Sequence, residues 1–214
     1  MNQGMNSEAQ QLIADARTLG AVLDETQAAR LLRLLDELTV WNRSYNLTAL
    51  TSREAMITGH LLDSLSAHAD LKGQRIADVG TGAGFPGLPL AVLEPQRQFT
   101  LIDSVAKKIR FVTHAARTLG LGNVTALQAR VETLSPPAPF DTVIARAFGT
   151  LADLLGSVQG LCGAETRVVA LKGHYPQDEL AELPRDWRLE HVRALQIPRL
   201  AAERHILSFV QQPG

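Results

Sequence analysis

The stretch Ile76-Ala77-Asp78-Val79-Gly80-Thr81-Gly82-Ala83-Gly84-Phe85-Pro86-Gly87 decides the fold of this chain. A short apolar run leads into a glycine-rich turn, after which Pro86 suits the first position of a helix. Glycine allows positive φ angles and lets a ligand contact the main chain. A strand, a glycine turn and a helix in this order are typical of a nucleotide site at a strand end. The stretch therefore predicts an α/β fold with a binding site at the turn.

From Gln74 onwards, apolar runs of strand length alternate with helical stretches, which indicates a parallel sheet with helices on both faces. We expect strands near residues 75–79, 98–102, 123–127, 140–145 and 166–171, and helices near 86–93, 105–119, 150–159 and 176–182. Beyond Pro184 the alternating pattern predicts an antiparallel hairpin added to the sheet. The predicted fold class is α/β, with a doubly wound, mainly parallel sheet.

The segment before Gln74 has a helical pattern. Apolar residues recur at three- and four-residue spacing from Leu12 to Leu38, and a further helix is expected over 53–71. The polar and aromatic segment between these helices, Trp41 to Thr48, favours a turn. Within it we expect Trp41, Tyr45 and Leu47 to be core residues, whereas Asn42, Asn46 and the later His60 are possible pocket residues. We divide the chain into a helical N-terminal extension, 1–73, and an α/β domain, 74–214.

The composition is that of a globular protein of 214 residues, with 45% hydrophobic and 20% charged residues. No run approaches a membrane span and the first residues show no targeting signal, so we expect a cytoplasmic protein without membrane contact. The single cysteine, Cys162, offers no pair for a disulfide or a metal, and no metal is expected. The formal net charge is -1. RNA binding would therefore need a local patch, for which Lys107, Lys108 and Arg110 are the candidates.

Two cofactors fit the glycine turn. Read as Gly82-x-Gly84-x-x-Gly87, with Asp103 following 21 residues after Gly82, the spacing suits NAD as well as S-adenosylmethionine. Asp78 favours S-adenosylmethionine over NAD, because a carboxylate directly before the turn repels the pyrophosphate of NAD, whereas S-adenosylmethionine carries a sulfonium and an ammonium group. An NAD-dependent oxidoreductase is the alternative.

Residues at the next two strand ends complete the predicted cofactor site. Asp103 ends the second strand and is placed to accept hydrogen bonds from ribose hydroxyls, with Ser104 as the N-cap of the following helix. Val131 and Glu132 follow the third strand, where a backbone amide and a carboxylate would contact an adenine. The alternative interpretation of Asp103 is that it only caps the helix that follows.

Two basic residues, Arg146 and Lys172, end the fourth and fifth strands at the carboxyl edge, where open α/β sheets bind ligands. The stretch Ala145 to Phe148 lacks the Asn/Asp-Pro-Pro-aromatic pattern of exocyclic-amine methylation, and Cys162 falls in a connection where it cannot serve as a nucleophile. Guanine N7 has a lone pair that attacks a methyl group directly, and it needs alignment more than a general base.

Taken together, these motifs resemble the bacterial 16S ribosomal RNA guanine-N7 methyltransferases, also called RsmG or glucose-inhibited division protein B. The resemblance runs from about Leu38 to Leu207. It is carried by Trp41-Asn42, Tyr45 to Thr48, His60 with Leu62 to Leu65, Asp78 to Gly87, Asp103-Ser104 with Lys107-Lys108, Arg130 to Glu132, Arg146-Ala147, Leu171 to Gly173 and Glu203-Arg204. The departures are Ala145, where many members carry Ser, and residues 1–37, which match only as an amphipathic helix.

The resemblance implies a Rossmann-like class I methyltransferase that transfers the methyl group of S-adenosyl-L-methionine to N7 of a guanine in the decoding-region loop of 16S rRNA. Its partner would be this RNA or the small ribosomal subunit, and a monomer is the default expectation. The implied cofactor contacts are Gly80, Phe85, Asp103, Ser104, Val131, Glu132 and Arg146, to which the turn itself adds Asp78, Gly82 and Gly84. Arg146 and Lys172 would position the base without a general base, and Lys107, Lys108, Arg110 and Arg204 would bind RNA. A non-catalytic RNA-binding protein with a vestigial cofactor loop is a second alternative.

Overall fold

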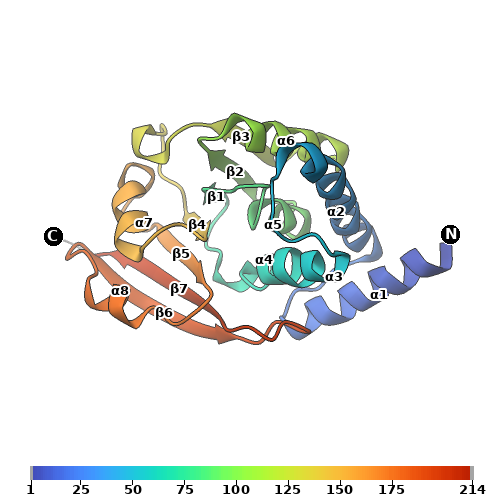
Figure 1. Cartoon of the computed structure of the whole chain (residues 1–214). Helices are drawn as coiled ribbons and strands as arrows, with labels where there is room; N and C mark the ends of the chain where they lie inside the picture. The colour runs from blue at the N-terminus through green and yellow to red at the C-terminus, as the bar shows by residue number, and fades with distance from the viewer. Residues whose placement is uncertain (1, 213–214) are drawn as a thin grey trace.

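A seven-stranded sheet in the order β3-β2-β1-β4-β5-β7-β6 forms the centre of the fold (Figure 1). The computed structural model describes the backbone of residues 2–212 and the side chains of residues 7–212. The parallel strands are β1 (Arg75–Val79), β2 (Gln98–Asp103), β3 (Val124–Gln128), β4 (Thr142–Arg146) and β5 (Arg167–Lys172). The order reverses between β1 and β4, which places the end of β1 at a topological switch point.

The C-terminal hairpin consists of β6 (Trp187–Leu195) and β7 (Arg204–Gln211). β7 pairs antiparallel with both β5 and β6, so the hairpin extends the sheet at the edge opposite to β3. This confirms the predicted antiparallel addition to a mainly parallel sheet. The alternating pattern read beyond Pro184 is that of an edge strand with one half-buried face.

Helices cover both faces of the sheet, as the doubly wound class requires (Figure 1). They are α5 (Gly87–Leu93), α6 (Ala106–Thr118), α7 (Leu151–Ser157) and α8 (Gln177–Ala181). Helices α5 and α6 pack in one apolar core with Ile144 and Val169 of the sheet, and α7 packs in a second core with Val143 and Val168. Successive strand residues point to opposite faces, which explains why neighbours in sequence belong to different cores.

The N-terminal extension packs on the first of these cores. Its elements are α1 (Asn2–Thr18), α2 (Glu25–Tyr45), α3 (Arg53–Met56), the π-helix η1 (Ile57–Leu62), α4 (Asp63–Leu65) and the 3-10 turn η2 (His68–Asp70). Leu12, Leu31 and Leu35 share their core with Leu90 and Ile206. The extension therefore contributes to the main core, while its division from the rest at residue 73 stays a prediction.

Two expectations for this extension need correction. The single helix over 53–71 is wrong, because its middle is the π-helix η1, a form that often marks functional sites. The core assignment of Tyr45 is also wrong, since 36% of this residue is exposed, whereas Trp41 and Leu47 are partly buried against the core. Neither a π-helix nor the exposed end of α2 can be read from apolar spacing.

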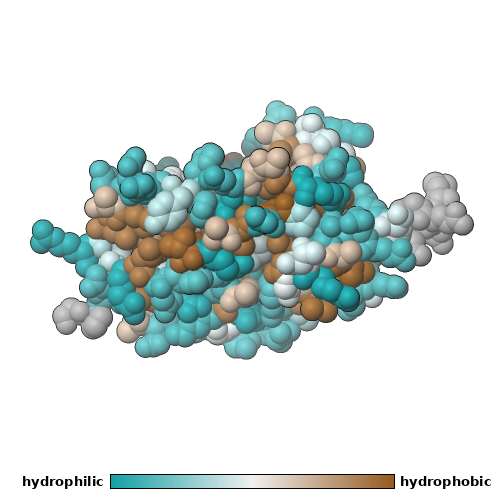
Figure 2. All heavy atoms as spheres, turned by 90° about the horizontal axis from the view of Figure 1, so that it is seen from below, coloured by the Kyte–Doolittle hydropathy of each residue, from teal (hydrophilic) through white to brown (hydrophobic). Residues whose placement is uncertain are grey.

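The surface is mostly hydrophilic on the face seen from below, with apolar side chains gathered in patches between polar ones (Figure 2). Within residues 2–212, no helix is long and apolar enough to cross a bilayer.

Candidate functional site

Asp78 holds the glycine turn in its closed form. Its carboxylate Oδ2 accepts hydrogen bonds from the hydroxyl of Thr81 at 2.6 Å and from the backbone N–H of Gly87 at 2.8 Å. A Cβ atom at position 87 would lie 2.6 Å from this oxygen, so the close approach requires glycine. Complete burial raises the pKa of Asp78 to about 7. Asp78 thus shapes the turn from behind, with its side chain out of contact with solvent.

A cavity of about 460 Å³ lies at the carboxyl ends of β1, β2 and β3, beside the loop that follows β4. Its volume falls within the usual range for small-molecule sites, roughly 300–1,000 Å³. Five of the predicted cofactor residues line it: Gly80, Asp103, Ser104, Val131 and Glu132. Gly80 has φ +66°, and a Cβ there would lie 3.0 Å from the Phe148 ring across the cavity mouth.

The other predicted cofactor residues do not line this cavity. Gly82 donates its backbone N–H to Asp103, Gly84 lies deeper in the turn, and Phe85 is buried at 3% exposure. Arg146 also lies outside, although the next three residues, 147–149, form part of the wall. The sequence predicts one group of cofactor-binding residues. The structure divides this group into residues that line the cavity and residues that support the turn behind it.

Asp103 is fixed at the cavity by three hydrogen bonds. Oδ2 accepts from the N–H of Gly82 at 3.0 Å and from Nζ of Lys108 at 3.2 Å, and Oδ1 accepts from the N–H of Val105 at 2.9 Å. The prediction that Ser104 is the N-cap is wrong, because α6 begins at Ala106, one residue later than that assignment requires, with Val105 before it. The side chain that bonds the backbone at this helix start belongs to Asp103.

Lys108 lies apart from the two other residues of the predicted RNA patch. Its ammonium group pairs with Asp103 and its side chain lines the cofactor cavity. Lys107 instead donates to the backbone carbonyl of Tyr45 at 2.7 Å, and Arg110 lies over the Tyr45 ring. Adjacent residues on a helix point about 100° apart, so this basic run is divided between two surfaces.

Arg146, at the end of β4, is bound by the N-terminal extension. Nη1 donates to the carbonyl of Gly59 at 2.7 Å and to Oδ2 of Asp63 at 3.1 Å, and Nη2 donates to Nδ1 of His60 at 3.2 Å. The guanidinium carbon lies 5.5 Å from the centre of the Phe85 ring. Because Gly59 belongs to the π-helix, the irregular turn of η1 presents its carbonyl to Arg146 rather than to the helix alone.

Asp63 joins Arg146 to the C-terminal hairpin. Its Oδ1 accepts from Nε of Arg204 at 3.0 Å while Oδ2 holds Arg146. The Asp63 side chain is 5% exposed, so both ion pairs are largely removed from water. Three segments distant in sequence meet at this residue, which we call the Asp63 clamp: Asp63, Arg146 and Arg204.

His60 is neutral beside this clamp. Burial, reinforced by the positive charge of Arg146, lowers the pKa of His60 to about 3. Its Nδ1 accepts from Arg146, and therefore its Nε2 carries the proton and donates to the hydroxyl of Thr48 at 2.8 Å. The ring stacks on Phe85 with centroids 4.4 Å apart. The Asn42 side chain bonds the backbone at Leu47 and Thr48, which fixes the segment that meets His60.

Lys172 lies on the opposite face of the sheet from the Asp63 clamp. Arg146 pairs in register with Leu171, so Lys172 points the other way. Its ammonium group donates to Glu179 of α8 at 2.8 Å and to the carbonyl of Gly149 at 2.9 Å. Gly149 is part of the cofactor-cavity wall. The structure thus brings Arg146 and Arg204 together but separates Lys172 from both.

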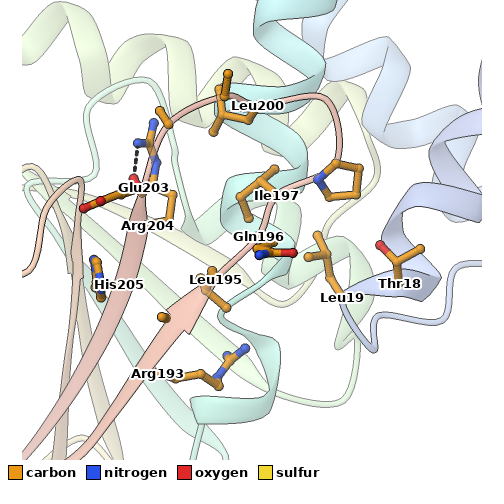
Figure 3. Close-up of a pocket in the computed structure, with 14 residues that line it drawn as sticks. Thr18, Leu19, Arg193, Leu195, Gln196, Ile197, Leu200, Glu203, Arg204 and His205 are labelled. Carbon is orange, nitrogen blue, oxygen red and sulfur yellow. Dashed lines mark hydrogen bonds between the residues drawn. The ribbon is translucent and has the colours of Figure 1, made fainter.

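A second hollow, of about 1040 Å³, lies between the end of α1 and the loop joining β6 to β7 (Figure 3). Arg204 is on its wall, and three arginines of the hairpin and its loop are paired across to the extension: Arg193 with Asp70, Arg199 with Asp15 and Arg204 with Asp63. We place the chemistry at the smaller cavity, because the predicted ligand residues converge there. The large hollow marks where the extension and hairpin dock.

Sequence reasoning missed two of the three groups that bond Arg146, namely Asp63 and the carbonyl of Gly59. Asp63 stood in the quoted Leu62 to Leu65 motif without a role, and the Gly59 carbonyl depends on a π-helix. Phe148 was also missed as part of the cavity wall.

Comparisons with known proteins agree with this geometry. Residues 27–207 match the family model described as rRNA small subunit methyltransferase G. The chain is 45% identical to Ribosomal RNA small subunit methyltransferase G of Aeromonas salmonicida, over 89% of this chain and 91% of that protein. It is 43% identical to the protein of the same name from Salmonella schwarzengrund, over 95% and 97%.

Solved structures with lower identity support the fold alone. Magnesium protoporphyrin IX methyltransferase from Synechocystis aligns with a TM-score of 0.57 at 18% identity, over 90% of this chain and 99% of that one. TrmN from Thermus thermophilus aligns with a TM-score of 0.57 at 21% identity, over 73% and 53%. The predicted Rossmann-like methyltransferase fold is confirmed.

Proposed function

The chain belongs to the rRNA small subunit methyltransferase G family, and on this premise we propose that it methylates N7 of one guanine in the decoding-region loop of 16S ribosomal RNA. The match of residues 27–207 to the family carries the proposal. Methyltransferases of this family use S-adenosylmethionine. Membership disfavours both the NAD-dependent oxidoreductase and the non-catalytic RNA-binding protein.

The residues of the cofactor cavity fit this methyl donor. Asp103 and Glu132 place two carboxylates in a cavity of about 460 Å³ that Lys108 and Arg130 also line, and carboxylate oxygens suit ribose hydroxyls and the amino edge of an adenine. Gly80 leaves the main chain open to the ligand. When bound, S-adenosylmethionine supplies an electrophilic methyl group on a sulfonium. Lys172 supports the wall through the Gly149 carbonyl, so we assign it to cavity positioning rather than to contact with the base.

The state of the nearby acids and bases favours N7 as the target atom. Among the described side chains around Arg146, His60 accepts a hydrogen bond from Arg146, both oxygens of Asp63 are held by arginines, and Asp78 is buried behind the turn. None is free to remove a proton from a substrate amine. Guanine N7 carries an available lone pair and loses no proton on methylation, so this arrangement suits it.

Charge compensation in the Asp63 clamp fits the same chemistry. Methylation at N7 leaves a positive charge on the guanine, and each nearby uncompensated cation would oppose it. Asp63 offsets one of the two arginines, and the low pKa of His60 keeps that ring neutral. We propose that Arg146 and Arg204 orient the guanine and its phosphate, while Lys107 and Arg110 contact RNA phosphates further out.

Transfer of labelled methyl groups to small ribosomal subunits tests this function. Subunits from a strain lacking the gene would be incubated with the protein and labelled S-adenosylmethionine, and the modified nucleotide mapped by mass spectrometry. A single N7-methylguanosine in the decoding-region loop is expected. Methylation at another atom, or cofactor binding without transfer to subunits or deproteinised RNA, would refute the N7 assignment.

A further inference from the structure

We infer that a hollow between α2 and α6 holds an unstacked base of the ribosomal RNA that flanks the target guanine, an inference that rests on the proposed RNA substrate. The hollow has a volume of about 580 Å³. Its wall consists of Trp41 from α2 and of Arg110, Thr113, His114, Arg117 and Thr118, which follow one another on α6. None of these residues lines the cofactor cavity.

Aromatic rings form one side of the hollow. The Trp41 ring lies 5.0 Å from the imidazole of His114 and 5.3 Å from the ring of Tyr45, measured between centroids. Arg110 lies over Tyr45, with its guanidinium carbon 5.8 Å from the ring centre. Single-stranded RNA is bound by stacking bases on aromatic rings and on guanidinium planes. The half-buried rings of Trp41 and His114 and the exposed guanidinium of Arg110 supply these surfaces on the wall, and Tyr45 lies beside it.

The hollow also carries uncompensated positive charge. Arg110 and Arg117 are exposed, and within the described side chains neither forms an ion pair, whereas Arg53, Arg193 and Arg199 all do. The nearby acid, Glu37, is already paired with Arg33 at 2.9 Å and with His114 at 2.8 Å. Exposed arginines beside rings suit a ligand with a flat base and a phosphate, which is a nucleotide.

The position of the hollow suits a nucleotide close to the target. Helix α6 begins at the cofactor cavity, which Lys108 lines, and Arg117 lies about 14 Å further along the helix axis. A stacked strand advances about 3.4 Å per nucleotide, so the far end of the hollow lies roughly four nucleotides from the cofactor cavity. Lys107, at the start of the same helix, donates to the carbonyl of Tyr45 and places a positive charge at the cavity end of this path.

Fluorescence of Trp41 gives a direct test, because the chain has two tryptophans. Trp187 is 2% exposed, and its Nε1 has no hydrogen-bond partner among the described residues, so Trp187→Phe removes the second signal without stranding a partner. We expect a single-stranded RNA dodecamer to quench Trp41 in this variant, and inorganic polyphosphate of matched charge to leave it nearly unchanged. Absence of quenching by RNA, or equal quenching by polyphosphate, would overturn the base site.

A charge-matched pair of variants gives the second test and avoids mutating packed residues. Arg110→Gln with Arg117→Gln removes two exposed charges at the hollow. Arg185→Gln with Arg188→Gln removes two exposed charges beside and on β6, at the opposite sheet edge. We expect only the first pair to weaken binding of deproteinised 16S RNA, by roughly tenfold at 0.1 M salt, and to reduce the slope of log K against log[salt] by about 1.4.

Equal RNA affinity of the two variant pairs overturns the inference. A loss of affinity for intact subunits without a loss for deproteinised RNA also overturns it, because that outcome assigns the surface to a ribosomal protein. Both measurements record binding and not methyl transfer. A chain that binds RNA at Trp41 but methylates another atom would contradict the N7 proposal and leave this site in place.

Discussion

Replacing Asp63 with Asn tests whether the shared carboxylate positions Arg146 and Arg204. The substitution keeps the shape of the side chain and removes its charge. In the native chain Oδ2 lies 3.1 Å from Arg146 and Oδ1 lies 3.0 Å from Arg204. The amide of Asn offers one acceptor and turns an N–H group toward the second guanidinium, so one arginine loses its partner and faces a donor.

The size of the effect follows from burial. The Asp63 side chain is 5% exposed, and removing one partner of a buried ion pair costs about 3–5 kcal/mol. For a chain of this length that lowers Tm by roughly 10 °C. A catalytic group displaced by about 1 Å costs roughly 100-fold in rate, so kcat should fall about 100-fold. Cofactor affinity should stay within about threefold, because Asp63 does not line the cofactor cavity.

Asp70→Asn is the matched control. The Asp70 side chain is 8% exposed and pairs with Arg193 of the same hairpin, yet it has no contact with Arg146. Unfolding and single-turnover methyl transfer would be measured for both variants at a temperature where both are folded. We expect similar losses of Tm but a kcat for Asp70→Asn within about threefold of the native value. If kcat falls equally in both, or is retained in Asp63→Asn, the clamp has only a structural role.

Three further predictions concern the turn and its surroundings. Burial raises the pKa of Asp78 from 3.8 to about 7, so the folded chain binds more protons at this residue than the unfolded chain between about pH 4 and 7, and its free energy of unfolding falls as the pH rises through this window. Asp78→Asn should remove about 3 kcal/mol of the fall that urea unfolding measures between pH 5 and pH 8, and parallel pH profiles of the native and variant chains would contradict it. Gly87→Ala places a Cβ 2.6 Å from the Asp78 carboxylate and should lower the free energy of unfolding by about 1–3 kcal/mol. The helical control Gly156→Ala has nothing within 4 Å of the new Cβ and should raise the free energy of unfolding by about 0.5–1 kcal/mol. Equal shifts in the two variants would refute the steric argument. Lys172→Met removes the hydrogen bond to the Gly149 carbonyl and should raise the Kd for S-adenosylmethionine, measured by calorimetry, by roughly tenfold. The kcat at saturating cofactor should stay nearly unchanged, and a loss confined to kcat would place Lys172 at the target base instead.

The glycine turn and the strand pattern predicted the fold because both are local. Each β strand is a short apolar run bounded by turn residues, and strand ends near residues 79, 103, 146 and 172 could be placed to within a residue or two. The cavity lining followed, since residues directly after neighbouring parallel strands must converge at one edge. Asp103 and Glu132 could therefore be assigned without knowing any side-chain contact.

The substrate side could not be predicted as well, because it depends on non-local register. Arg146 and Lys172 end adjacent strands and have equivalent positions in the sequence pattern, but the pairing of Arg146 with Leu171 directs Lys172 to the other face. Lys107 and Lys108 are neighbours in sequence and yet serve different surfaces. In each case a shift of one residue changes the face, and spacing within a single element does not fix that choice.

The Asp63 clamp also explains why segments outside the central parallel sheet matter for the chemistry. The extension supplies Asp63, His60 and the Gly59 carbonyl, and the hairpin supplies Arg204, whereas the parallel sheet contributes Arg146 alone. Three Arg–carboxylate pairs dock the hairpin on the extension, but one of them, through Asp63, also reaches the sheet. The sheet aligns with other methyltransferase structures, and we propose that these two segments supply the substrate side. Changes in acceptor within this fold should be sought there, because function depends on the site and not on the fold.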